Sequence, residues 1–421
     1  MNKAAIGVSV VAITAITWAG AVHYTGTEVD NYSAQLITSA NQAMQGEALL
    51  VNTLSDSSFG KRSYLIELQD QSKNVIAQLE HNVIIGPGLS SGEFKVVDSQ
   101  ELYGFLAEIG LKKLPLNLDW KASVWSQTWD ANFVVTEHDL SANPNFSEYK
   151  TQELRLVMNG DLNGNQITGN LVWPGLTIKS DQGDVNLKAL SMSSVSSLVD
   201  GVYLNDDFSM KIENLDISGK NFAGEMAGGF SSKNLILASR GKMLDQQISG
   251  DLQLSSESFT ASDVFNQLEL SNTQLMLTFK DFSWQAFKLA QQNVEDIANP
   301  DEITKLIVEH GFEARIDKLE SNVKATMQGQ ETQGLVSASG KLDLAGGPAT
   351  VSDEELIPRI AAVVELKVDQ NLVNHFAGPY AQQIPLLIGM GYLVEEAPYL
   401  KTKLEFVDGQ LIANDAAPIP L

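Results

Sequence analysis

The stretch TQLMLTFKDFSW, residues 273–284, alternates along most of its length between two kinds of side chain. Leu275, Leu277 and Phe279 fall on one side of an extended chain, and Lys280 falls on the other. A strand with one apolar and one polar face belongs to a sheet that is buried on one side and solvated on the other. The stretch therefore predicts an antiparallel strand.

Similar alternating runs recur along the chain after about residue 55, and Gly, Asn, Asp and Ser punctuate them. They lie at residues 61–70, 74–86, 132–140, 153–160, 165–173, 176–180, 184–192, 208–219, 234–241, 251–259, 312–328, 332–346, 360–370 and 399–415, the last turning at Asp408–Gly409. Gaps of turn length indicate antiparallel pairing, because parallel strands need longer crossovers. The predicted fold is α+β and mainly β: an N-terminal transmembrane helix, then an extended antiparallel β-meander with a few covering helices.

Three segments interrupt the strands with helical spacing. They are residues 104–115, residues 283–311 with a break at Asn299–Pro300, and residues 371–396 with kinks at Pro379 and Pro385. No sharp linker or strict repeat divides the chain. The expected organisation is a signal anchor over residues 1–26, an amphipathic helix over 27–54, a β-rich region over 55–282, a helix-plus-strand region over 283–415 that continues the same sheet, and a flexible tail over 416–421.

Residues 4–22 contain no charged side chain, and as a helix they would measure about 28 Å, close to the hydrocarbon thickness of a bilayer. Trp18 and Tyr24 lie near the far end, where amphipathic rings favour the headgroup level. Lys3 lies on the near side, and no further lysine or arginine follows until Lys61. The positive-inside bias keeps the amino terminus in the cytoplasm. It places the bulk of the chain in the periplasm of a Gram-negative cell.

A cleavable signal peptide is the alternative, because Ala19-Gly20-Ala21 satisfies the small-x-small rule. Helical spacing continues after Val22, which favours a retained anchor on the inner membrane. The residues expected to form the anchor are Lys3, Ala4, Ile6, Val8, Val10, Val11, Ile13, Ile16, Trp18, Val22 and Tyr24.

Composition narrows the classes of function. In 421 residues, 52 acidic side chains against 28 basic ones give a net charge of −24. This charge repels phosphate backbones, so nucleic acid is not an expected partner. Cysteine is absent. Disulfides, thiolate metal sites and a cysteine nucleophile are therefore excluded.

No motif for catalysis or cofactor binding stands out. The run NGDLNGN, residues 159–165, places Asp161 at the first position of a calcium-loop pattern. Gln166 and Val172, however, occupy the positions where that loop needs Gly and Glu. A hairpin turn between two strands is the favoured interpretation.

The five histidines lack the close spacing of a zinc motif. They are His23, His81, His138, His310 and His375. Each is expected to be packed or solvent-exposed, so no metal, cofactor or catalytic residue is predicted. The chain is expected not to be an enzyme. A periplasmic hydrolase that assembles a scattered site from His81, His138 and His310 is the less favoured alternative.

An extended sheet with one apolar face must cover that face. Helices within residues 283–311 and 371–394 can pack over it and form a core. If they cover it only in part, the remaining apolar surface suits an acyl chain or a partner's helix. Both alternatives stay open at this level.

Several short stretches carry a resemblance to a known family. They are Met1-Asn2-Lys3, Tyr24-Thr25-Gly26, the glycine-punctuated strands near 153–173, the strand-to-helix segment with Leu277, Phe279, Trp284, Phe287 and Gln291-Gln292, and the closing strand GQLIAND at 409–415. Over most of its length the chain resembles the YdgA-like family of bacterial envelope proteins. That family often has a His-Gly-Pro element where this chain has Ile85-Gly86-Pro87, with His81 a few residues earlier.

The resemblance implies an inner-membrane anchored periplasmic protein, with a homodimer as one form, and supplies no catalytic residues. Together with the strand pattern it suggests a non-enzymatic protein that binds an envelope protein or an acyl-bearing ligand. Binding would use the apolar face of the sheet or one of its edges. A homodimeric structural scaffold is the alternative.

Overall fold

The computed structural model describes most of the chain after residue 48. The described residues are 37–38, 41, 44, 48–58, 60–86, 89–97, 104, 106–107, 111, 113, 115–123, 125–141, 143, 145–220, 226–292, 300–348, 356–414 and 416–420. The predicted anchor, residues 1–26, lies outside this part of the chain, as does the first part of the amphipathic helix expected over 27–54. Among the described residues, no helix combines the length and the apolar character needed to cross a bilayer.

The described chain is mainly β and antiparallel, which confirms the predicted meander. It forms two compact units, one of residues 1–181 and 188–201 and one of residues 182–187 and 202–421. The strands of unit 1 are β1 Leu49–Asp56, β2 Lys61–Gln69, β3 Val75–Gly86, β4 Leu89–Val96, β5 Leu116–Ser123, β6 Thr128–Val135, β7 His138–Asp139, β8 Glu148–Thr151, β9 Leu154–Asp161 and β10 Gln166–Lys179. β11, Gly183–Val199, contributes residues to both units.

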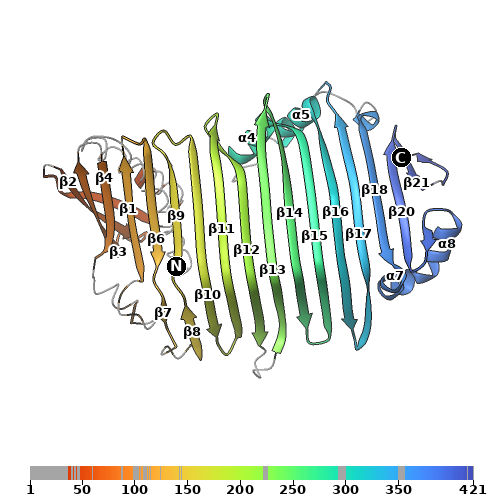
Figure 1. Cartoon of the computed structure of the whole chain (residues 1–421), viewed down its shortest axis with the longest axis horizontal. Helices are drawn as coiled ribbons and strands as arrows, with labels where there is room; N and C mark the ends of the chain where they lie inside the picture. The colour runs from red at the N-terminus through yellow and green to blue at the C-terminus, as the bar shows by residue number, and fades with distance from the viewer. Residues whose placement is uncertain are drawn as a thin grey trace. The chain divides into compact units, whose positions relative to one another are not determined.

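The elements of unit 2 include the longest strands (Figure 1). They are β12 Val202–Lys220, β13 Met226–Leu244, β14 Gln247–Asp263, β15 Asn266–Ser283, α4 Trp284–Gln292, α5 Pro300–His310, β16 Gly311–Met327, β17 Gln330–Ala345, η1 Ile357–Arg359, β18 Ile360–Asp369, α7 Gln370–Ala377, η2 Gly378–Gln383, α8 Ile384–Gly389, β19 Val394–Glu396, β20 Tyr399–Val407, β21 Gln410–Ala413 and β22 Ile419–Pro420. Strands β12 to β18 pair in chain order, and β20 then pairs with β18.

Unit 1 pairs in sequence from β1 to β6, and β6 then pairs with β9, which pairs with β10. Its core contains large aromatic side chains. Tyr64, Trp120 and Trp129 are buried in one cluster together with Val83. Trp120 lies across Gly92 on the neighbouring strand, because only a residue without Cβ leaves room for the indole. Close packing of these rings makes this core sensitive to added atoms.

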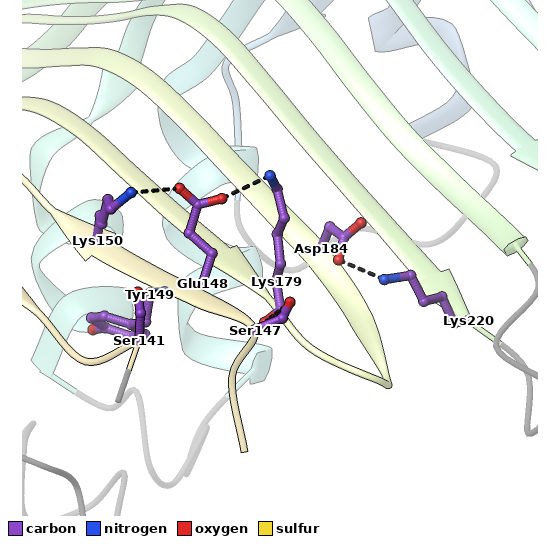
Figure 2. Close-up of polar contacts among 8 residues, drawn as sticks. All are labelled: Ser141, Ser147, Glu148, Tyr149, Lys150, Lys179, Asp184 and Lys220. Carbon is purple, nitrogen blue, oxygen red and sulfur yellow. Dashed lines mark hydrogen bonds and ion pairs between the residues drawn. The ribbon is translucent and has the colours of Figure 1, made fainter. Parts of the chain in front are cut away.

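Charged side chains pair on the partly exposed surface of strands β8 and β10 in unit 1. Figure 2 shows the Glu148 carboxylate between two lysines, with Lys150 Nζ at 3.0 Å and Lys179 Nζ at 2.7 Å. These contacts, first to Lys179 and then to Lys150, hold the pKa of the Glu148 carboxyl below its usual value. Figure 2 also shows a separate pair in unit 2, in which Lys220 Nζ lies 2.8 Å from Asp184 Oδ1. These pairs are partly exposed, so each adds little to stability.

The boundary of the first strand differs from the prediction. The helix expected over 27–54 was wrong at its end, because residues 49–54 belong to β1, which pairs with β2. The Asn41 side chain fixes this start: its Oδ1 accepts a bond of 2.6 Å from the Leu50 N–H, and its Nδ2 donates to the Leu50 carbonyl. Leu50 is buried with Ile66 and Leu68. The pairing with β2 and this burial outweigh the helical spacing of the sequence.

Two of the three predicted helical interruptions are confirmed in part, and the first, residues 104–115, lies mostly outside the described residues. Residues 283–311 contain two helices, α4 and α5, and α5 begins at Pro300. Residues 370–389 are divided into α7, η2 and α8, with Pro385 in the first turn of α8. The helical segment predicted over 371–396 was wrong at its end, because residues 394–396 form β19, which pairs with β20. The hairpin at Asp408–Gly409 joins β20 to β21. The flexible tail over 416–421 stays a prediction, although β22 pairs with β21.

Long strands in unit 2 carry an extra residue near their middle. Ile212 pairs with Leu235, and Leu215 pairs with Ser232. Residues 212 and 215 are three positions apart, so in a regular strand their side chains would lie on opposite faces of the sheet. The residues between them place Glu213 opposite Asn234, and the next pairings place Asn234 opposite Glu257.

The next strand, β15, places Asn272 opposite Glu257 of β14, so these four residues form one row across four strands. Asn234 and Asn272 have positive φ angles of 48° and 52°, which interrupt the pleat. The Asn234 side chain donates a bond of 2.6 Å to Glu257. We call Glu213, Asn234, Glu257 and Asn272 the kink row. In each strand the apolar residues on the two sides of the row are an odd number of positions apart, which in a regular strand would place them on opposite faces. The extra residue at the kink row keeps them on the same face.

We predict that Gly92→Ala destabilises unit 1 by about 1–3 kcal/mol, because the added methyl overpacks the core. Its carbon would lie 2.2 Å from Trp120 Nε1. Urea unfolding followed by tryptophan fluorescence measures this loss. The control is Gly104→Ala, where the new methyl meets no described atom within 4 Å. Equal unfolding midpoints for the two variants would contradict the prediction.

Candidate functional site

The register of unit 2 gathers its aliphatic side chains on one face. In strand β17, which alternates regularly, Val336, Ala338 and Leu342 share a face with Gly340 between them. Directly paired residues of antiparallel strands lie on the same side of the sheet. The pairings therefore extend this face to Leu366, Val364 and Leu404 on one side of β17. The other side adds residues of strands β16 to β12.

We call this surface the apolar face. On the central strands it contains Ile212, Leu215, Ile217, Leu235, Leu237, Leu252, Leu254, Phe259, Leu268, Leu270, Leu275, Leu277, Phe279, Ala314, Ile316, Leu319, Val323 and Ala325. No lysine or arginine from the paired segments of β12 to β20 that the structure describes is among its members.

Many side chains of the apolar face remain accessible. Six aliphatic residues keep between 36% and 43% of their surface exposed: Ile217, Leu268, Leu342, Val364, Leu366 and Leu404. A packed core residue would be fully enclosed. The face is therefore covered only in part.

Helices cover the two ends of the apolar face. At one end, Trp284 and Ala286 of α4 are fully buried, together with Ile248 of β14. At the other end, Leu372 of α7 is 2% exposed and lies against Gly334 of β17. Figure 1 shows α4 and α5 at the first end and α7 and α8 at the second. Of the two interpretations that the sequence left open, partial coverage is the one that the exposed leucines favour.

The opposite face of unit 2 is charged, and its charges pair with one another. Glu313 receives Arg315 at 2.7 Å, Lys341 at 2.9 Å and Lys280 at 3.6 Å from three adjacent strands. A bond from Lys341 is the largest of the causes that lower the pKa of the Glu313 carboxyl. These contacts keep the carboxylate ionised. We call this surface the charged face.

A hollow of about 510 Å³ lies on the charged face over strands β16 to β20. Lys318, Glu320, Glu365, Lys367, Lys401 and Lys403 are among its lining residues. Lys367 Nζ lies 3.8 Å from the centre of the Tyr399 ring, and Lys401 pairs with Glu396. The positive and negative side chains largely neutralise one another. The hollow thus lacks the single-signed charge that would define a site for a small anion or cation.

His81 is the most unusual titratable residue of unit 1. It is 2% exposed, its ring stacks on Phe94 at 4.0 Å between centroids, and its Nε2 accepts a bond of 3.1 Å from Trp120 Nε1. Burial lowers the pKa of this imidazole to about 3. The residue is therefore neutral at physiological pH. Its surroundings are a packed aromatic core, as the default interpretation of the histidines expected.

The calcium-like loop at Asp161 and the histidines His138 and His310 have local structural roles. Asp161 accepts backbone bonds from Asn163, Asn165 and Gln166, which closes the β9–β10 turn and confirms the hairpin. His138 contacts the Thr136 carbonyl, and His310 contacts the Leu306 carbonyl in its own helix. Within the described ranges, His, Asp and Glu side chains form no group of three or more that could hold a metal ion. The absence of catalysis stays a prediction.

All anchor residues predicted from the sequence, Lys3 to Tyr24, lie outside the described part of the chain. The sequence did not single out the exposed leucines of the apolar face, although their alternation with polar residues on either side of the kink row was a signal that could have identified them. It also did not single out the kink row. That row appears in the sequence as two or more polar residues between apolar ones, as in Ile212-Glu213-Asn214-Leu215.

No protein-family model matches the chain, and no curated protein or solved structure matches it. The resemblance to the YdgA-like family therefore stays a prediction from the quoted stretches.

We predict that unit 1 loses stability as the pH falls below 6.5. The unfolded chain binds a proton at His81 near pH 6.5, whereas the folded chain does so only near pH 3. The contribution of this neutral histidine is present above pH 6.5 and declines as the pH falls towards 3. Between pH 7 and pH 5 the loss is about 2 kcal/mol.

Urea unfolding at both pH values measures this loss in the wild type and in His81→Phe, which cannot titrate. Carboxylates contribute equally to both proteins, so the difference between the two pH dependences isolates His81. His138→Gln is the matched control at a partly exposed histidine. The same pH dependence in His81→Phe and the wild type would refute the prediction.

Proposed function

We propose that this chain is a non-enzymatic binding protein of the bacterial envelope and that it holds an acyl-bearing amphiphile against the apolar face of unit 2. The observation that supports this proposal is a broad aliphatic surface without lysine or arginine, on which six side chains are between 36% and 43% exposed. Soluble surfaces rarely expose contiguous apolar patches of this kind unless a ligand or partner covers them.

Several features of the apolar face favour an acyl chain as its ligand. Aliphatic side chains such as Leu342, Leu366 and Leu404 offer contact area without directional bonding. A hydrocarbon chain gains about 0.8 kcal/mol for each methylene that leaves water. It also needs no hydrogen-bond partner. The ligand's polar headgroup would remain in solvent, because the apolar face has no cation to bind it.

A second candidate is a homodimeric scaffold in which two apolar faces pack against each other. Two sheets pack face to face about 10 Å apart in β-sandwiches, and aliphatic faces suit such packing. The same six exposed residues would then become buried. The acyl ligand is preferred because it also agrees with a protein held at a membrane.

The proposed location rests on the sequence. The uncharged segment at residues 4–22 and the resemblance to the YdgA-like family support an inner-membrane anchor, with the bulk of the protein in the periplasm. Membrane lipids, which carry acyl chains, border that compartment. The location and the ligand support each other, but they are separate proposals with separate tests.

The ligand is tested in intact cells that express the full chain and are fed a fatty acid bearing a photoactivatable diazirine. Irradiation should join the probe to unit 2. Leu366→Gln removes a contact worth about 0.5–1 kcal/mol, so the adduct should fall about two- to fivefold. Met276→Gln is the matched control, because Met276 and Leu366 are both 37% exposed and lie on opposite faces.

Equal adduct in both variants would reject the apolar face as the binding surface. A disulfide-linked dimer of a Leu366→Cys variant, formed under added oxidant without any lipid adduct in the wild type, would favour the homodimer, since the chain has no other cysteine. Either result leaves the location of the protein untouched.

The location is tested with reporters fused after Leu421. Alkaline phosphatase, which is active only outside the cytoplasm, should be active in this fusion. A fluorescent protein that fails to mature after export should stay dark. Amino-terminal sequencing of the membrane fraction should recover the segment before Val22. A bright cytoplasmic reporter, or a mature protein that begins at Val22, would reject the retained anchor.

A further inference from the structure

The segment Gln370–Val394 differs in charge from the rest of the chain. Its twenty-five residues include no Asp, Glu, Lys or Arg, whereas charged residues make up 19% of the whole protein. The segment comprises α7, η2, α8, the turn that follows and Val394, the first residue of β19. We call it the helical cap. In a protein with a net charge of −24, it is a long uncharged stretch among the described residues.

The helical cap turns large apolar side chains towards solvent. Their exposed fractions are 53% for Phe376, 66% for Tyr380, 62% for Leu386, 50% for Met390 and 42% for Val394. These values exceed nearly all of those on the apolar face. Leu372 points the other way and packs against Gly334, so the cap is held to the sheet by its inner side. Its outer side is unpartnered in the described structure.

A second exposed apolar group lies at the same end of unit 2. The turn between β14 and β15 presents Val264 at 63% and Phe265 at 73% exposure. Figure 1 shows this turn and the cap at one end of the long strands, with α4 and α5 at the other. Phe265 also accepts a backbone bond from Gln328 in the β16–β17 turn, which holds the two turns together. Apolar and aromatic side chains thus gather at one end of the sheet.

We propose that the helical cap, with the Val264–Phe265 turn, docks onto the surface of a lipid bilayer. The charge of the protein supports this partner. An acidic chain is repelled by anionic surfaces, and the uncharged cap is where that repulsion is weakest. Exposed Phe, Tyr, Leu and Met side chains on short helices suit the boundary between headgroups and acyl chains. The polar side chains of the cap, among them Asn374, Gln382 and Gln383, are uncharged, so they lose less hydration free energy at a headgroup layer than ionised side chains would.

This docking goes beyond the proposed function and does not depend on it. Through Leu372 the cap packs beside Gly334, which pairs with Val323 of the apolar face. A bilayer at the cap would therefore lie next to the surface proposed to hold acyl chains. Binding of the cap to lipid can nevertheless occur with no ligand on that face.

The test uses the absence of cysteine in this chain. Leu386→Cys introduces one attachment point for an environment-sensitive fluorophore in the full-length protein. The protein is reconstituted in phosphatidylcholine vesicles that do or do not contain a nitroxide-labelled lipid. We expect a blue-shifted emission and at least twofold quenching by the nitroxide. Leu244→Cys is the matched control, a leucine 65% exposed at the β13–β14 turn on the opposite end of unit 2.

The control fluorophore should show neither the shift nor the quenching. Adding Tyr380→Glu and Met390→Glu to Leu386→Cys should abolish both signals while circular dichroism stays unchanged. Emission and quenching that are the same at residues 386 and 244 would overturn the proposal. A blue shift at residue 386 without nitroxide quenching would also overturn it, because a second copy of the chain would then be the occupant.

Discussion

Everything in unit 2 depends on keeping the apolar side chains of very long strands on a single face. A strand of seventeen to nineteen residues offers many positions at which the alternation can change parity. A slip of one residue would send every following leucine to the charged face. The kink row prevents this outcome in four neighbouring strands at once, since its extra residues lie opposite one another.

The kink row is also chemically consistent. Glu213, Asn234, Glu257 and Asn272 alternate acid and amide across the strands, and Asn tolerates positive φ better than most residues. Beside the row, the buried hydroxyl of Ser256 contacts the carbonyls of Lys233 and Ser258 at 3.1 and 2.8 Å. A short polar side chain thus satisfies backbone groups that the interrupted pleat leaves free. Register on the charged face is reinforced by ion pairs that connect adjacent strands, such as Lys280–Glu313–Lys341.

The sequence predicts the strands and the class of fold because a period of two is a local property. It also predicts the Asp408–Gly409 hairpin and the helix breaks at prolines, which follow from the backbone preferences of single residues. The start of β1 was missed because it is decided by pairing with β2 and by the Asn41 side chain, which are contacts between distant residues. The sequence left open whether His81 is packed or exposed to solvent. Its burial depends on Trp120, which lies over Gly92 and donates to His81, and this contact between distant residues is not visible in the sequence.

The end of the meander has a consequence for self-assembly. Without further pairing, β20 would be an edge strand of unit 2 with unpaired backbone N–H and C=O groups. The three-residue β19 pairs with the first half of β20, and the four-residue β21 pairs with its second half. The two-residue β22 then follows β21. An unpaired long margin would template the addition of further molecules, as in amyloid growth. Progressively shorter strands remove that template, so a protein built from repeated hairpins can carry a wide sheet without polymerising at this border.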